Sequence, residues 1–231
     1  MHIHKPKPLH GTREFLSEIS VIVLGVLIAL ALEQGVEFLD WSHKVAQAEV
    51  RLAADLKDDS SYAAQYAILK PCAEAYLDRM QTDLIKHDAA DLTRLYDFGT
   101  PFIGFPWKVV AWQTAVSSQI GDHMSNRRYQ YYAEAFRGAD LLRDFQLRYR
   151  DDYAAAITGR FALPPDTKTM MDQLAAVERL REYIRIGRNI AANDLVIPVA
   201  IHLGVTPDRA TIAFLQQEAT KCLALVGRPS K

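Results

Sequence analysis

The sequence predicts an all-α protein in which one N-terminal transmembrane helix continues into an antiparallel helical bundle. Three observations favour this class. Apolar residues recur at helical spacing along most of the 231 residues. No stretch alternates apolar and polar residues over the length of a half-buried strand. An almost unbroken apolar segment, residues 17–34, lies close to the start, and about 190 residues remain outside the N-terminal region, enough for one domain.

The N-terminal helix has an apolar core over residues 19–32 that alone spans about 21 Å, short for a bilayer. Extension to residues 15–39 gives roughly 25 residues, which cross about 30 Å of hydrocarbon. Glu18 and Glu33 then lie near the borders, where charge is least costly. The predicted organisation is a short cytoplasmic N-terminus (1–13), a transmembrane helix (14–40) and a helical extracytoplasmic domain (41–231).

Two other interpretations of this helix stay open. A basic start and the Ala-Leu-Ala triplet at 29–31 resemble the parts of a cleaved secretory signal. Against cleavage, Glu14 and Glu18 stand where such signals favour positive charge, and the helical pattern continues past Gly35 to Leu56. A buried helix of a soluble protein is the other alternative. The retained anchor is the favoured interpretation.

The flanking charges predict the orientation of the anchor. The cations before the helix are Lys5, Lys7 and Arg13. After it, Glu33, Glu37 and Asp40 precede the first cation, Lys44. Because positive charge favours the cytoplasmic side, the N-terminus is expected in the cytoplasm and the domain outside it. In a bacterium this places the protein in the inner membrane and its domain in the periplasm.

One face of the helix is the candidate partner surface. On a helical wheel, the residues that share it are Glu18, Ile22, Gly25 and Ala29, with Glu33 at its edge. Small residues at i and i+4 let a second helix approach closely in lipid. We therefore expect the span to pack against itself or another inner-membrane protein. The alternative is that Gly and Ala are simply common in membrane helices.

The residues "IHKPKPLHGTREFLSEISVIVLGVLIALALEQGVE", 3–37, resemble the opening of an uncharacterised bacterial family of single-span inner-membrane proteins. Members have a Lys-Pro-Lys-Pro-Leu-His-Gly-like start, one apolar helix and a helical extracytoplasmic domain. "AWQTAVSS", 111–118, and "YQYYAEAF", 129–136, resemble a second family segment. Relatives tend to have a Trp after the His-Gly of the first segment and a Gly after the Ser pair of the second, where this chain has Thr12 and Gln119. The resemblance implies the anchor but brings no activity, ligand or site residue.

The rest of the chain predicts further helices separated by short breaks. In order, they cover 41–69, 72–96 with a break at 87–90, 109–120, 126–158, a helix carrying apolar residues from 170 to 190, a buried segment 195–204 bent at a proline, and a last helix to 226. Pro71 is expected to end the first of them. Thr206 and Pro207 are expected to start the last one, as N-cap and first-turn proline. Aromatic residues within 129–153 recur at helical spacing and predict core packing.

The loop "TPFIGFPW", 100–107, is strongly apolar, and its prolines and glycine exclude a regular helix. Its large side chains are Phe102, Ile103, Phe105 and Trp107. If these side chains are exposed, they would form a contact surface for a partner or a membrane. The alternative, which we favour, is a loop tucked over the domain's own core.

Two cysteines, Cys72 and Cys222, occur without a CxxC or CxxH pattern, which leaves too few sulfurs for a closed zinc site. In an oxidising compartment they are candidates for one disulfide. The alternative is two independent buried thiols.

Composition and motifs exclude several function classes. The 27 basic and 28 acidic residues alternate along the chain, so no nucleic-acid partner is expected. No nucleophile elbow, Walker, dinucleotide-binding or HExxH pattern occurs, so we expect no catalytic residue, metal or cofactor. The predicted function is a non-enzymatic, membrane-anchored accessory or scaffold subunit. The alternative is an extracytoplasmic ligand-binding or sensory domain with a cleft lined by Trp112 and the Tyr-rich helix.

Overall fold

The structure, a computed structural model, describes residues 11–158 and 165–227. These residues form helices and no strand, which confirms the all-α class. Helix α1 spans Thr12–Ala63. Residues 1–10, which hold Lys5, Lys7 and most of the family-like start, lie outside the described residues, as do residues 159–164.

The chain divides into two compact units, with the boundary between Gln47 and Ala48. In the first unit, every side chain described in residues 12–40 is exposed. This part of α1 is long and apolar enough to span a membrane. In the second unit, Leu52 and Leu56 are fully buried, so the end of α1 belongs to the core of the helical domain.

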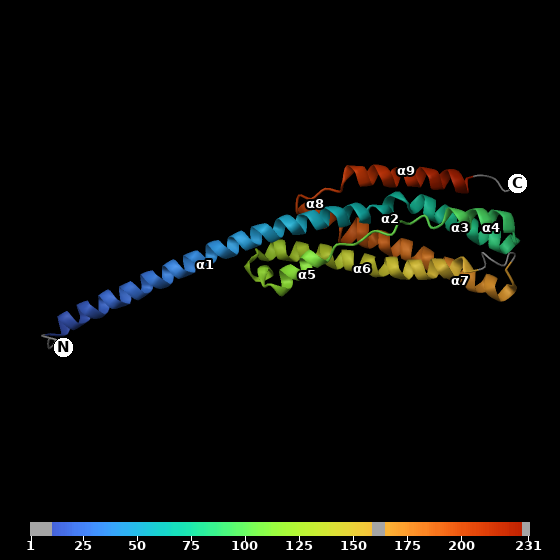
Figure 1. Ribbon diagram of the computed structural model, residues 1–231. Helices are drawn as coiled ribbons and strands as arrows, with labels where there is room; N and C mark the ends of the chain where they lie inside the picture. The colour runs from blue at the N-terminus through green and yellow to red at the C-terminus, as the bar shows by residue number, and fades with distance from the viewer. Residues whose placement is uncertain (1–10, 159–164, 228–231) are drawn as a thin grey trace, which may run out of the picture. The chain divides into compact units, whose positions relative to one another are not determined.

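The helical domain contains α1 from Ala48 onward and the elements that follow it. These are α2 (Gln65–Ile68), α3 (Lys70–Lys86), α4 (Ala89–Phe98), α5 (Val110–Ser117), the 3-10 turn η1 (Ile120–His123), α6 (Asn126–Ala156), α7 (Thr167–Arg188), the π-helical turn η3 (Asn189–Asp194), α8 (Ile197–His202) and α9 (Arg209–Val226). Figure 1 shows α6 and α7 side by side and antiparallel. Helix α3 packs against both α7 and α9.

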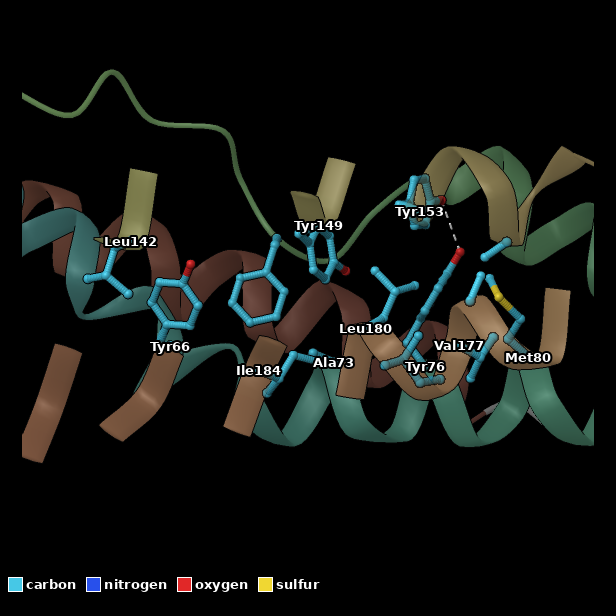
Figure 2. Close-up of a cluster of buried hydrophobic side chains, with 14 of the residues drawn as sticks. Tyr66, Ala73, Tyr76, Met80, Leu142, Tyr149, Tyr153, Val177, Leu180 and Ile184 are labelled. Atoms are coloured by element: carbon cyan, nitrogen blue, oxygen red, sulfur yellow. Dashed lines mark hydrogen bonds between the residues drawn. The ribbon is translucent and has the colours of Figure 1, made fainter. Parts of the chain in front are cut away.

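The core lies where α3, α6 and α7 meet. Its α3 and α7 members recur at helical spacing, so each helix presents one apolar stripe; they include Ala73, Tyr76, Leu77, Met80 and Leu84 of α3 and Val177, Leu180 and Ile184 of α7. Figure 2 shows side chains of α3 and α7, among them Tyr76, Met80 and Leu180, beside Tyr149 and Tyr153 of α6. Burial of such side chains, at roughly 1.5–3 kcal/mol each, is the main force that holds the domain together.

Aromatic residues of α6 are buried, as their spacing predicts. Tyr149 and Tyr153 belong to this core, and Tyr132 and Phe136 are buried as well. The hydroxyl of Tyr76 donates to the Leu95 carbonyl at 2.9 Å and lies 3.2 Å from the Tyr153 hydroxyl. These polar tips therefore keep hydrogen-bond partners inside the core, where an unpaired hydroxyl would be costly.

One predicted helix boundary holds with a difference, and another is wrong. A helix does end before Pro71, since α2 ends at Ile68, but Pro71 itself occupies the first turn of α3, where its missing N–H costs nothing. The predicted helix 41–69 also breaks at Ala63, before the short α2. Thr206 does not cap the last helix: Asp208 does, and its carboxylate accepts the Thr211 N–H at 3.0 Å.

The predicted break at 87–90 is confirmed. His87 adopts a left-handed conformation with φ of 56° and ends α3. Asp88 then caps α4 by accepting the Asp91 N–H at 3.1 Å. A helix end and a helix start thus follow each other within two residues, which turns α4 back onto α3.

Candidate functional site

The predicted partner face of the first unit is free of contacts within the described chain. Its residues, Glu18, Ile22, Gly25, Ala29 and Glu33, are all exposed. A Cβ added at Gly25 would meet nothing within 4 Å, so the small-residue surface is open. The hydroxyl of Ser20 donates to the Leu16 carbonyl at 2.7 Å and is thereby satisfied within the helix. What packs on this face stays a prediction.

The apolar loop 100–107 lies against the core of its own domain; together with the next residue, Lys108, it is called the 100–108 loop below. Phe102 and Trp107 are each only 8% exposed, while Ile103 and Phe105 are half-buried. The Phe102 ring packs between Tyr66 and Tyr149, with ring centroids 5.3 Å from each. The structure therefore corresponds to the tucked loop, and Phe102 and Trp107 do not form an exposed contact surface.

Gln146 of α6 holds the 100–108 loop in place. Its Oε1 accepts the Phe105 N–H at 3.1 Å and the Trp107 indole N–H at 3.0 Å. Its Nε2 donates to the Phe105 carbonyl at 3.2 Å. A second amide, Gln65, accepts the Ile103 N–H at 3.1 Å. Side-chain amides thus replace the ladder hydrogen bonds that an irregular loop lacks.

Replacing Gln146 by Leu is expected to lower the free energy of unfolding of the domain by roughly 2–4 kcal/mol. The change leaves the Phe105 amide and the Trp107 indole without their partners at a part-buried position. Urea denaturation followed by circular dichroism measures the effect. Gln217→Leu, at an exposed position of α9, is the matched control and should be close to neutral. Equal stability of the two variants would show that Gln146 does not hold the loop.

Acidic residues of α1 hold the end of the same loop. Lys108 forms an ion pair with Asp58, and its backbone N–H donates to Asp59 Oδ1 at 2.8 Å. Asp59 is fully buried, and its Oδ2 has no hydrogen-bond partner among the described residues. Burial raises the pKa of Asp59 to about 7, with a smaller contribution from Asp55 and despite the Lys108 hydrogen bond.

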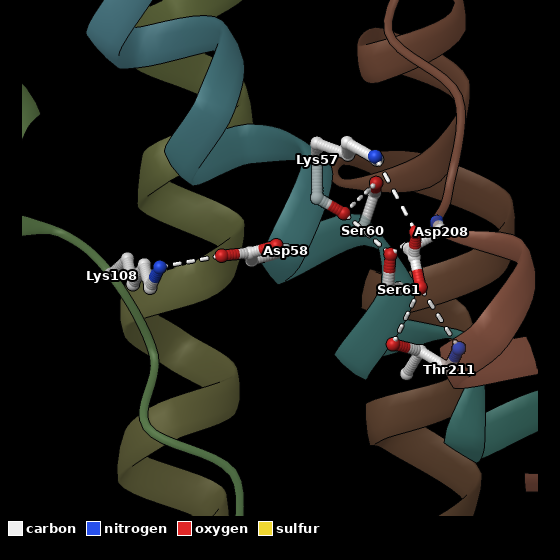
Figure 3. A network of polar contacts seen from close by, with 7 residues as sticks. All are labelled: Lys57, Asp58, Ser60, Ser61, Lys108, Asp208 and Thr211. Atoms are coloured by element: carbon white, nitrogen blue, oxygen red, sulfur yellow. Dashed lines mark hydrogen bonds and ion pairs between the residues drawn. The ribbon is translucent and has the colours of Figure 1, made fainter. Parts of the chain in front are cut away.

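The next residues of α1 hold the start of α9. Lys57 pairs with Asp208 at 3.4 Å, and the Ser61 hydroxyl accepts the Asp208 N–H at 2.6 Å. Figure 3 shows both groups of contacts, with Lys108 on one side of this turn of α1 and Asp208 on the other. One turn of α1 therefore fixes both the 100–108 loop and the entry to the last helix.

Cys72 of α3 and Cys222 of α9 form a disulfide, with their Cα atoms 5.8 Å apart. Both residues are buried. Because α9 buries only Leu215 and Cys222 among its side chains, the bond is a major attachment of this helix to the domain.

Three carboxylates, Asp83, Asp88 and Asp91, place oxygens within 4.8 Å of one another. Arg79 pairs with Asp83 at 2.9 Å and also with Asp91, while Asp88 caps α4. The arginine supplies the positive charge that a cation would bring, so the cluster is explained as an ion-pair network. This network has no signature in the sequence, because its members come from two helices and a cap.

The domain carries open clefts on both sides of α6. One, of about 290 Å³, is lined by residues that include Trp112 and Phe136, whose rings stack at 5.9 Å. Another, of about 430 Å³, is lined by Arg127, Arg128, Tyr131, His202 and Leu203. The second cleft has no signature in the sequence, because α6 and α8 bring together residues about seventy positions apart that share no motif.

Comparison of the chain with known protein families, curated proteins and solved structures gives no match.

Proposed function

We propose that the protein is a non-enzymatic, single-span accessory or scaffold subunit of a bacterial inner membrane. Its span packs against itself or another inner-membrane protein, and its helical domain extends from that contact. The observation that carries the proposal is the contrast between the two units. The apolar side chains of residues 15–39 are exposed, whereas the domain buries its own core. Such a helix requires lipid or protein around it.

The orientation proposed is a cytoplasmic N-terminus and a periplasmic domain. The disulfide between Cys72 and Cys222 supports it, because structural disulfides persist in oxidising compartments. The excess of cations before the span and of acids directly after it supports the same orientation. The resemblance of residues 3–37 to a family of single-span inner-membrane proteins agrees with both.

Replacing Gly25 and Ala29 together by Ile is expected to weaken association of the span at least about tenfold, or ~1.4 kcal/mol. The added side chains would hold a second helix away from the small-residue surface. Ala31→Ile, a small-to-large change on the opposite side of the helix, is the matched control. The measurement is the oligomeric state and the co-purifying protein in mild detergent.

The intact mass of the purified chain is measured first, because a cleaved signal would leave the protein without residues up to the 29–31 triplet. Unchanged association of the Gly25 and Ala29 variant, with the anchor retained, would contradict the proposed contact face.

A second candidate function, an extracytoplasmic ligand-binding or sensory domain, is favoured by the cleft beside Trp112. Its indole stacks on Phe136 with an interplanar angle of 5° and offers a flat aromatic surface next to Arg137 and Asp140. A small molecule that raises the Tm of the wild type but not of Trp112→Ala would support this function over the scaffold.

A further inference from the structure

The second cleft beside α6 joins two elements far apart in sequence. Arg127, Arg128 and Tyr131 come from the start of α6, and His202 and Leu203 from the end of α8. The Tyr131 and His202 rings stack with centroids 5.6 Å apart, which fixes the two walls relative to each other. The cleft encloses about 430 Å³, more than a bare inorganic anion requires. We call it the basic cleft.

The basic cleft carries excess positive charge. Its lining contains two arginines and no carboxylate. Arg128 is paired with Glu49 at 2.8 Å, so its guanidinium is oriented. Arg127 is exposed and takes part in none of the ion pairs formed among residues 11–158 and 165–227. By contrast, two arginines of α7 are paired with acids: Arg181 with Asp78, and Arg185 with Glu182.

The position of the two arginines adds to this charge. Both lie in the first turn of α6, where the helix dipole is positive and cations are disfavoured. No acidic residue lies in this turn, and the N-cap residue Ser125 makes no side-chain capping hydrogen bond. Two cations therefore lie beside the positive end of the helix dipole, and an anion in the cleft would reduce the repulsion between them.

We propose that the basic cleft binds a phosphate group, carried either by a phospholipid or by a soluble phosphate compound. Guanidinium groups match phosphate oxygens in a planar, bidentate geometry, and Arg127 has its whole fork available to them. The Tyr131 hydroxyl and the His202 imidazole are further hydrogen-bond donors of the lining. The basic cleft is larger than one phosphate group, and the remaining volume accommodates the part of the ligand that carries the phosphate.

A phospholipid is one source of this phosphate because the chain proposed to span the membrane precedes the cleft closely in sequence. Glu49, the partner of Arg128, follows Leu39, the last residue of the apolar segment, by ten residues. This choice of source rests on the proposed function, whereas binding of phosphate itself does not.

The test measures thermal unfolding of the full-length protein in neutral detergent with two separate probes. One is inorganic phosphate, compared with chloride at equal ionic strength so that general screening is subtracted. The other is dihexanoylphosphatidylglycerol. Binding is expected to raise the Tm by about 5 °C at saturation. The Arg127→Gln variant is expected to bind each probe at least about tenfold more weakly than the wild type. The Arg185→Gln variant loses the same charge at another exposed arginine and is expected to bind the probes as the wild type does.

A rise in Tm with both probes would mean that the cleft recognises the phosphate group itself. A rise in Tm with the lipid alone would mean that the phosphate comes from a lipid headgroup. Either result supports the proposal. No response to either probe, or equal responses of Arg127→Gln and Arg185→Gln, overturns it. The Gly25 and Ala29 variant keeps the basic cleft and should bind the probes normally. Failure of the span contact and failure of phosphate binding are therefore separate results.

Discussion

Reduction of the bond between Cys72 and Cys222 is expected to lower the free energy of unfolding of the helical domain by about 5 kcal/mol. The bond closes a loop over a sequence separation of 150 residues, and loss of that closure restores the conformational entropy of the unfolded chain. The effect should be concentrated at α9, because this helix buries few side chains of its own. Its start would still be held by Lys57 and Ser61.

Urea denaturation with and without a phosphine reductant measures this loss. The Cys72→Ala and Cys222→Ala double variant should be destabilised similarly and should not respond to reductant. Coincident unfolding curves of the oxidised and reduced wild type would show that the bond does not stabilise the domain.

The Asp59→Asn variant is expected to be more stable than the wild type by roughly 2–4 kcal/mol at pH 8. Burial raises the pKa of Asp59 from 3.8 to about 7, a difference that corresponds to about 4 kcal/mol before relaxation of the surroundings. The native state therefore holds the proton more tightly than the unfolded state. The stabilisation from protonated Asp59 is complete below pH 3.8 and is lost as the pH rises through about 7.

The side-chain amide that Asp59→Asn introduces keeps an acceptor for the Lys108 N–H and stays neutral at every pH. Urea denaturation at pH 5 and pH 8 should show a smaller pH effect in the variant than in the wild type. The other charged groups that act on Asp59 are Asp55, Asp58 and Lys108. Asp151→Asn is the control, because it removes one carboxylate from an exposed ion pair with Arg150 and leaves the buried acid and the charges that act on it. Parallel pH profiles of wild type and Asp59→Asn would refute the role of Asp59.

Features set by neighbouring residues could be predicted from the sequence. The all-α class, the break at 87–90 and the buried aromatic residues of α6 all depend on spacing within one segment. Pro71 shows where local rules become ambiguous, because a proline both follows helix ends and occupies first turns. Both occur here, because α2 ends at Ile68 and Pro71 lies in the first turn of α3.

Features set by distant residues could not be predicted. The position of the 100–108 loop against the domain depends on hydrogen bonds to Gln65 and Gln146. The sequence around these two residues does not distinguish them from other glutamines. Exposed and tucked loops have the same sequence signature, so only the partners distinguish them. The basic cleft is a similar case, because its arginines and His202 meet only through the packing of α6 against α8.

The separation of the two cysteines also has a consequence for biogenesis. At a synthesis rate of about 5–20 residues per second, Cys72 waits on the order of ten seconds before Cys222, 150 residues later, is made. During this interval its thiol has no partner within the sequence, since Cys72 and Cys222 are its two cysteines. Oxidation must therefore follow the emergence of α9, which makes closure of the bond a late event in the maturation of the domain.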